Sequence, residues 1–70
     1  MNKAILEFTL GGSKHRYYRR KSIFGEAVIT TNIHSAKKLT ESEVPKVIEL
    51  LKKQFGEKVN DIKPIKDGDN

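Results

Sequence analysis

Residues 3–21 read KAILEFTLGGSKHRYYRRK, and this stretch decides the fold. Apolar and polar residues alternate over residues 3–10, which is the two-residue period of a half-buried β-strand. Gly11 and Gly12 follow, and glycine tolerates the positive φ angles that a tight hairpin turn requires. The chain then returns through residues 14–21. The stretch therefore predicts a β-hairpin.

The register of this hairpin decides which tyrosine faces the core. A two-residue loop pairs Leu10 with Ser13 and sets Tyr17 opposite Leu6, on the apolar side of the first strand. A four-residue loop keeps Tyr17 on that side. A three-residue loop exchanges Tyr17 with Tyr18, because a slip of one residue reverses the faces.

We favour an even loop, because it sets Glu7 opposite Arg16 or Tyr18 and keeps the core aromatic residues together. On this interpretation Tyr17 is a core residue. The residues expected to share the opposite, open face are Arg16, Tyr18 and Arg20. Arg19 then points toward the helix side or the sheet edge.

The strands expected beyond this hairpin are short. Residues 22–25 (Ser-Ile-Phe-Gly) predict a second turn, and residues 26–31, rich in Val, Ile and Thr, predict a third strand. Asn32 is a candidate cap for a short helical turn. Residues 58–65 are compatible with a fourth strand, which Pro64 would restrict to a sheet edge.

Residues 39–55 carry the strongest helical pattern. Thr40 and Glu43 fit a capping box, with Leu39 and Val44 as its hydrophobic staple. Gly56 is a suitable C-terminal stop. One apolar stripe at helical spacing is formed by Val44, Val47, Ile48, Leu51 and Phe55.

The start of this helix is open between two residues. If Thr40 is the cap, Pro45 falls in the second turn, where it removes a backbone hydrogen bond. If Ser42 is the cap, Pro45 lies in the first turn at no cost, but the capping box is lost.

These elements predict one small α+β domain over residues 1–66. Its core is a three-stranded antiparallel meander with a single helix across one face, and residues 58–65 would extend the meander if they form a fourth edge strand. Residues 67–70 form a polar tail. Seventy residues leave no room for a second domain. The absence of cysteine and of a signal peptide makes a cytoplasmic location the expectation.

The net charge is concentrated in one segment. The chain has 14 basic and 9 acidic residues, hence a net charge of +5. Residues 14–21 hold five cations and no anion, so the remaining residues are neutral in sum. All arginines and both tyrosines lie there too, and arginine suits phosphates and aromatic faces.

This basic segment supports two functional hypotheses. The first is a non-enzymatic module that contacts the phosphates of DNA or RNA, with the expected contact residues Lys14, Arg16, Tyr18, Arg19, Arg20 and Lys21. The second is an accessory protein that binds an acidic partner or self-associates through an open sheet face, for which Ile5 and, as further candidates, Tyr18 and Ile29 are the apolar residues. The sequence predicts no catalytic residue, metal site or cofactor. His15 and His34 lack the spacing of metal ligands.

The order of elements, a basic three-stranded meander followed by one helix, resembles the arm-type DNA-binding domains of phage-like integrases. The resemblance covers about residues 3–55 and implies a sheet applied to DNA. Residues 29–33 and 36–40 also look like small accessory proteins encoded by phages and mobile elements of Gram-positive bacteria. Neither resemblance carries a functional residue over to this chain.

Overall fold

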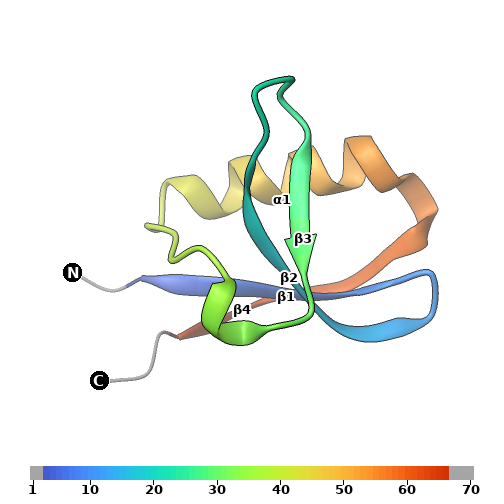
Figure 1. The fold of residues 1–70 in the computed structure, drawn as a ribbon, viewed down its shortest axis with the longest axis horizontal. Coiled ribbons are helices and arrows are strands. Elements are labelled where there is room, and N and C mark those ends of the chain that lie inside the picture. Colours follow the sequence, from blue (N-terminus) through green and yellow to red (C-terminus); the bar gives the residue numbers. More distant parts are fainter. Residues whose placement is uncertain (1–2, 67–70) are drawn as a thin grey trace.

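The computed structural model describes residues 3–66, which form a four-stranded antiparallel sheet with one α-helix on one face (Figure 1). The elements in chain order are β1 (Ala4–Leu10), β2 (Ser13–Lys21), β3 (Ala27–Thr30), the 3-10 turn η1 (Ile33–Ser35), α1 (Glu43–Phe55), the 3-10 turn η2 (Gly56–Lys58) and β4 (Val59–Lys66). The strand order is β3-β2-β1-β4, so the predicted α+β meander is confirmed. The predicted tail, residues 67–70, lies outside the described residues.

The fourth strand is also confirmed. β4 pairs antiparallel with β1 and lies at the edge of the sheet, where Pro64 stands opposite Leu6. A proline has no N–H to donate, so an edge is the position that it tolerates. The other edge is β3.

The register of the first hairpin differs from the prediction because β2 contains a bulge. The turn at Gly11 and Gly12 has the expected two residues, since Leu10 pairs with Ser13. One extra residue of β2 then faces β1, so that Glu7 pairs with Tyr17. His15 lies in this bulge with a φ of 61°. The extra residue reverses the faces of the rest of β2, and the predicted placement of the two tyrosines is wrong.

β2 changes partners along its length. Tyr17 is paired on both sides, with Glu7 of β1 and Thr30 of β3. Beyond Tyr17 the strand leaves β1 and continues with β3 as a two-stranded arm that projects from the sheet (Figure 1). Arg19 is an extra residue in this arm, between the pairs of Tyr18 and Arg20.

Residues 37–39 fill the space where β2 leaves β1. The N–H of Lys37 donates to the carbonyl of Tyr18 at 3.0 Å. Leu39 exchanges two backbone hydrogen bonds with Ala4, at 2.8 and 2.7 Å. The link between β3 and α1 is thereby fastened to both strands.

The start of α1 combines the two alternatives. The helix begins at Glu43, so Pro45 lies in its first turn, where no N–H is needed. The capping pair nevertheless forms in one direction, because the N–H of Thr40 donates to Oε1 of Glu43 at 2.9 Å. Gly56, with a φ of 59°, follows the last residue of the helix as predicted.

The core lies between α1 and the sheet. Its fully buried side chains are Leu6, Phe8, Leu39 and Leu51. The helix also reaches the edge strand β3, since Gln54 accepts from the N–H of Ala27 at 2.6 Å and donates to its carbonyl at 3.1 Å.

The apolar open face that the sequence offered for self-association is not present. Ile5 is buried, although it points away from the core side of β1. Tyr18 and Ile29 belong to the core between the sheet and α1. Figure 1 shows the link through η1 crossing the sheet on the side opposite α1.

Candidate nucleic-acid interface

The six predicted contact residues do not share one face. Lys14 lies beside the bulge at the turn end of β2. Arg16 pairs with Phe8, a core residue, and so lies on the α1 side of the sheet. The expectation that Arg16 shares the open face with Arg20 is therefore wrong. The three that are exposed together at the far end of β2 are Arg19, Arg20 and Lys21.

Neither tyrosine is available to stack on a base. Tyr18 is 4% exposed within the core, so its predicted place on the open face is wrong. Burial raises its pKa, and the charge of Glu43 adds to the increase. Tyr17 is buried as well, and burial followed by its hydrogen bond to Glu7 raises its pKa.

A second set of cations joins the exposed end of β2. The hydrogen bond from Lys37 to Tyr18 brings the 37–39 segment beside Arg19, and the pairing of Leu39 with Ala4 brings in the start of β1. All of these lysines and arginines are exposed. We call this set the basic face, which consists of Lys3, Arg19, Arg20, Lys21, Lys37 and Lys38.

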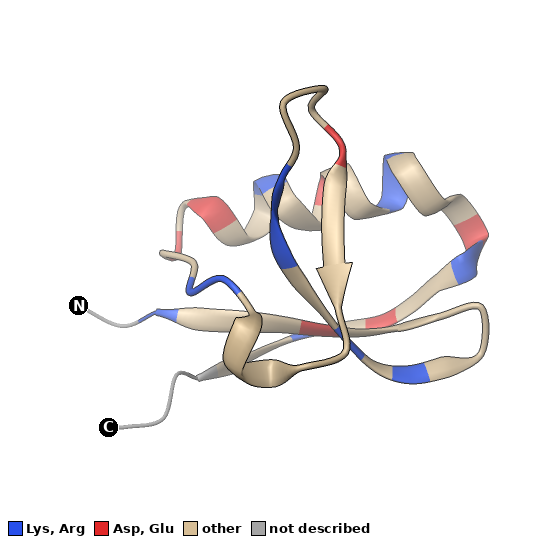
Figure 2. Cartoon of the chain, viewed as in Figure 1, with Lys and Arg blue, Asp and Glu red and all other residues tan. Residues whose placement is uncertain are grey.

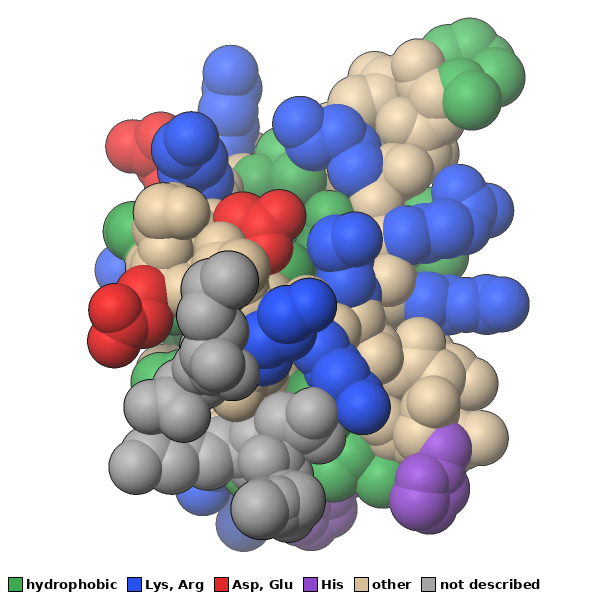
Figure 3. All heavy atoms as spheres, turned by 90° about the vertical axis from the view of Figure 1, so that its left-hand side faces the viewer, with side chains coloured by type: hydrophobic (Ala, Val, Ile, Leu, Met, Phe, Trp, Pro, Cys, Tyr) green, Lys and Arg blue, Asp and Glu red, His purple; other side chains and the backbone are tan. Residues whose placement is uncertain are grey.

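Figure 2 shows basic residues on the β2 arm, on the 37–39 segment and at the start of β1. In Figure 3, which views the molecule from the left-hand side of Figure 1, Lys and Arg side chains gather below a protruding apolar tip. The basic face thus draws on three separate segments of the chain. The basic face is therefore not the same as the linear basic segment, residues 14–21.

The nearest acid of α1 is already engaged. Glu43 accepts hydrogen bonds from the backbone N–H and the hydroxyl of Thr40, and these lower its pKa. The charges of Lys37 and Lys3 lower it further, so both lysines lie close enough to interact with it. The carboxylate of Glu43 therefore neutralises part of the positive charge of the basic face, on the side near Lys3 and Lys37.

The tip of the β2–β3 arm carries two exposed apolar residues. Ile23 is 93% exposed and Phe24 is 84% exposed. The turn beneath them is well defined, because Ser22 takes part in four hydrogen bonds with the backbone of the residues that follow it. The apolar tip is therefore held in solvent by an ordered turn.

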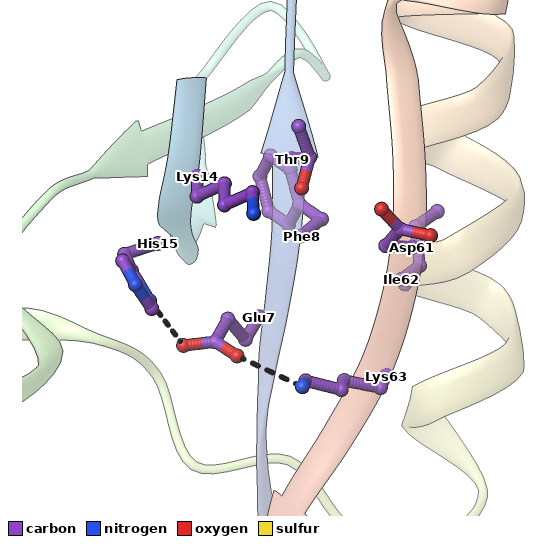
Figure 4. A pocket seen from close by; sticks show the side chains of 8 residues that line it. All are labelled: Glu7, Phe8, Thr9, Lys14, His15, Asp61, Ile62 and Lys63. Carbon is purple, nitrogen blue, oxygen red and sulfur yellow. Dashed lines mark hydrogen bonds and ion pairs between the residues drawn. The ribbon is translucent and has the colours of Figure 1, made fainter. Parts of the chain in front are cut away.

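A separate polar cluster lies beside β1 at the other end of β2 (Figure 4). The carboxylate of Glu7 accepts from the hydroxyl of Tyr17 at 3.0 Å and lies 3.2 Å from Nδ1 of His15. Its other oxygen is 3.6 Å from Nζ of Lys63 on β4. The bond with His15 lowers the pKa of Glu7 most, against the opposing effect of burial, and Tyr17 and Lys63 lower it further.

This cluster borders an open cavity of about 400 Å³. Two bulges frame the cavity, one at His15 in β2 and one at Asp61 in β4, and both residues have positive φ angles. Both oxygens of Glu7 have partners. The carboxylate thus ties β2 and β4 to β1.

Two further observations concern residues 3–66. They contain no group of three or more His, Asp or Glu side chains that could hold a metal ion. None of their helices has both the length and the apolar character that crossing a bilayer requires.

No protein-family model matches the chain, and neither the curated proteins nor the solved structures provide a match.

Sequence reasoning missed two components of this surface. It placed the net charge in residues 14–21 and left out Lys37 and Lys38, although the structure sets the 37–39 segment against that strand. It also treated residues 22–25 only as a turn. The available signal was the presence of Ile23 and Phe24 where polar residues are usual.

Proposed function

We propose that the protein binds nucleic acid through its phosphate backbone, with the basic face as the contact surface and little preference for sequence. The supporting observation is the gathering of exposed cations from three segments on one side of the molecule. Lysine and arginine that neutralise phosphates release condensed counterions, which makes such binding favourable and dependent on salt.

The buried tyrosines change how this binding works. The sequence analysis placed Tyr18 among the contact residues, but Tyr17 and Tyr18 are both buried. The proposed contacts on the basic face are therefore made by charge alone. Contacts to phosphates position a protein on nucleic acid without reading its sequence.

The test is the salt dependence of binding to a labelled DNA duplex, measured by fluorescence anisotropy. Three to five phosphate contacts imply a slope of about −3 to −4.5 in a plot of log affinity against log salt. Arg19→Ser with Arg20→Ser is expected to reduce the slope by about two units. Both side chains are exposed, so the variant is expected to fold.

A matched control removes the same charge elsewhere. Lys52 and Lys53 lie in the last turn of α1, at the end of the helix remote from the 36–42 link (Figure 1). Lys52→Ser with Lys53→Ser is expected to leave the slope nearly unchanged. Equal effects from the two pairs would show diffuse attraction rather than a site. Absence of binding at low salt contradicts the proposal and favours an acidic protein as the partner.

A further inference from the structure

The β2–β3 arm combines features that the proposed phosphate contacts do not explain. Its end holds Ile23 and Phe24 almost fully in solvent, in a chain whose other large apolar side chains are at most 37% exposed among the described residues. Directly before them on β2 come three exposed cations, Arg19, Arg20 and Lys21. An apolar tip therefore stands at the end of a basic ribbon.

The turn holds this tip in place. Oγ of Ser22 accepts from the N–H groups of Phe24 and Glu26, each at 3.2 Å. The backbone of Ser22 donates to the carbonyl of Glu26 at 2.7 Å and accepts from Gly25 at 3.0 Å. Because the turn is already ordered, little conformational freedom is left to lose when the tip is buried by a partner.

We infer that the partner of the arm is duplex DNA, and that Phe24 enters between two stacked base pairs while the cations of β2 hold the adjacent phosphates. This inference rests on the proposed function and adds a deformation of the duplex to it. β-Ribbons can enter the minor groove of B-DNA as well as the major groove. Apolar side chains that enter a base step from the minor groove unstack it and kink the duplex.

The shape of the tip favours a duplex over a single strand. Proteins that bind single strands stack bases on aromatic residues along a groove that follows the backbone. Here the aromatic residue stands at a convex end, with Ile23 beside it. A convex apolar tip is suited to act as a wedge, because a wedge gains its contacts from both faces of an opened step.

The charges favour DNA over a membrane surface. A membrane surface with anionic lipids attracts cations and repels acids on every side of an inserted tip. The cations of this arm lie on β2 alone, and exposed Glu26 stands on the other side of the tip. From β2 the basic face continues away from the tip toward Lys37. A one-sided row of this kind matches a phosphate backbone.

The experiment compares a fully paired DNA duplex with the same duplex carrying one mismatched base pair. A mismatch removes part of the cost of opening a step, so the wild-type protein is expected to bind the mismatched duplex on the order of tenfold more tightly. A 2-aminopurine beside the mismatch is expected to brighten on binding, because its fluorescence rises when it is unstacked. Phe24→Ser is expected to abolish the preference and the brightening while leaving the salt slope unchanged.

Two further variants sharpen the test. Phe24→Leu keeps an apolar tip and is expected to retain most of the preference for the mismatched duplex. Ile33→Ser removes a partly exposed apolar residue elsewhere and is expected to have no effect. Because both tip residues are exposed, the tip variants are expected to fold. A thermal melting curve unchanged from wild type verifies this.

The outcomes separate this inference from the proposed function. Wild-type binding with a normal salt slope but no preference for the mismatch overturns the wedge and leaves phosphate binding intact. Failure to bind either duplex at low salt overturns both. A preference for single-stranded DNA that depends on Phe24 overturns the duplex as partner. Binding to phosphatidylserine vesicles that depends on Phe24, together with no preference between the two duplexes, also overturns the duplex as partner.

Discussion

The hydroxyl of Tyr17 donates a 3.0 Å hydrogen bond to the carboxylate of Glu7, and the two residues stand directly opposite each other in the β1–β2 ladder. Tyr17 therefore lies on the side of the sheet away from α1, and Tyr18, the next residue, lies in the core. A single bulge at His15 produces this arrangement.

The two tyrosines give a direct test of this register. Burial raises the pKa of both above the ordinary value of about 10, and the chain has no tryptophan to mask their absorbance. We expect an ultraviolet titration to show both tyrosines ionising above the ordinary pKa. Because both pKa values are raised in the folded state, keeping the two tyrosines protonated stabilises the folded protein. This stabilisation is complete below the pKa of the unfolded chain and is lost as the pH rises through the pKa values of the folded protein.

The variant Tyr17→Phe assigns the signal in that titration. It is expected to leave one tyrosine, which still titrates above the ordinary value. One tyrosine that titrates normally in the wild-type protein would mean an exposed side chain, as the even-loop register from the sequence predicted for Tyr18.

A second prediction concerns Glu7. Replacing it with glutamine removes the charge that holds His15, Tyr17 and Lys63, and is expected to lower the free energy of unfolding by about 1 to 2 kcal/mol near neutral pH. Urea denaturation measures the difference. Unchanged stability would contradict the role of the cluster in joining β2 and β4 to β1.

The same variant has a pH dependence of known sign. The pKa of Glu7 is lowered in the folded state, so its contribution is present above the unfolded pKa of about 4.3 and is lost as the pH falls through the folded value. The stability difference between wild type and Glu7→Gln is therefore expected to shrink as the solution is acidified below about pH 4. A difference that stays constant into strong acid would exclude an ionised, hydrogen-bonded Glu7.

Much of the fold could be predicted from local patterns. The turn at Gly11 and Gly12, the helix that ends before Gly56 and the edge strand with Pro64 all follow from residues whose backbone preferences are strong. The side of β2 on which each residue lies could not be predicted. A positive φ is uncommon for residues other than glycine, and the enrichment of histidine at such angles is too weak a signal to mark His15 as the extra residue of a bulge.

The candidate site was less predictable than the fold for a related reason. The sequence identified Arg19, Arg20 and Lys21 but not their neighbours. Lys37 joins them only because β2 leaves β1 after Tyr17 and the 37–39 segment fills the space. Such a separation depends on the twist of the whole sheet, which a window of local sequence does not contain.

A third prediction uses the bulge in β4. Asp61 has a φ of 53°, a conformation that costs a β-branched residue about 1 to 2 kcal/mol. Asp61→Val is therefore expected to destabilise the protein by about that amount, and Asp61→Gly to change its stability by less than about 1 kcal/mol. Asn60→Val, at a neighbouring exposed position without a positive φ, is the control and is expected to be better tolerated than Asp61→Val. Equal losses at both positions would argue against the bulge.

The last prediction tests the packing of α1 on the sheet with two adjacent leucines. Leu51 is fully buried, whereas Leu50 is only partly buried at the margin of the core. Leu51→Ala is expected to cost about 2 to 5 kcal/mol, because it removes buried methyl groups and leaves a cavity. At about 0.05 to 0.15 kcal/mol per residue, a chain of 70 residues has a total stability of about 3.5 to 10.5 kcal/mol, so this variant is expected to lose a large share of it and to melt far below wild type. Leu50→Ala makes the same chemical change with a smaller loss of buried surface and is expected to remain folded.

Melting curves followed by circular dichroism distinguish the Leu51→Ala and Leu50→Ala variants. Equal melting temperatures would mean that the helix does not present Leu51 to the sheet.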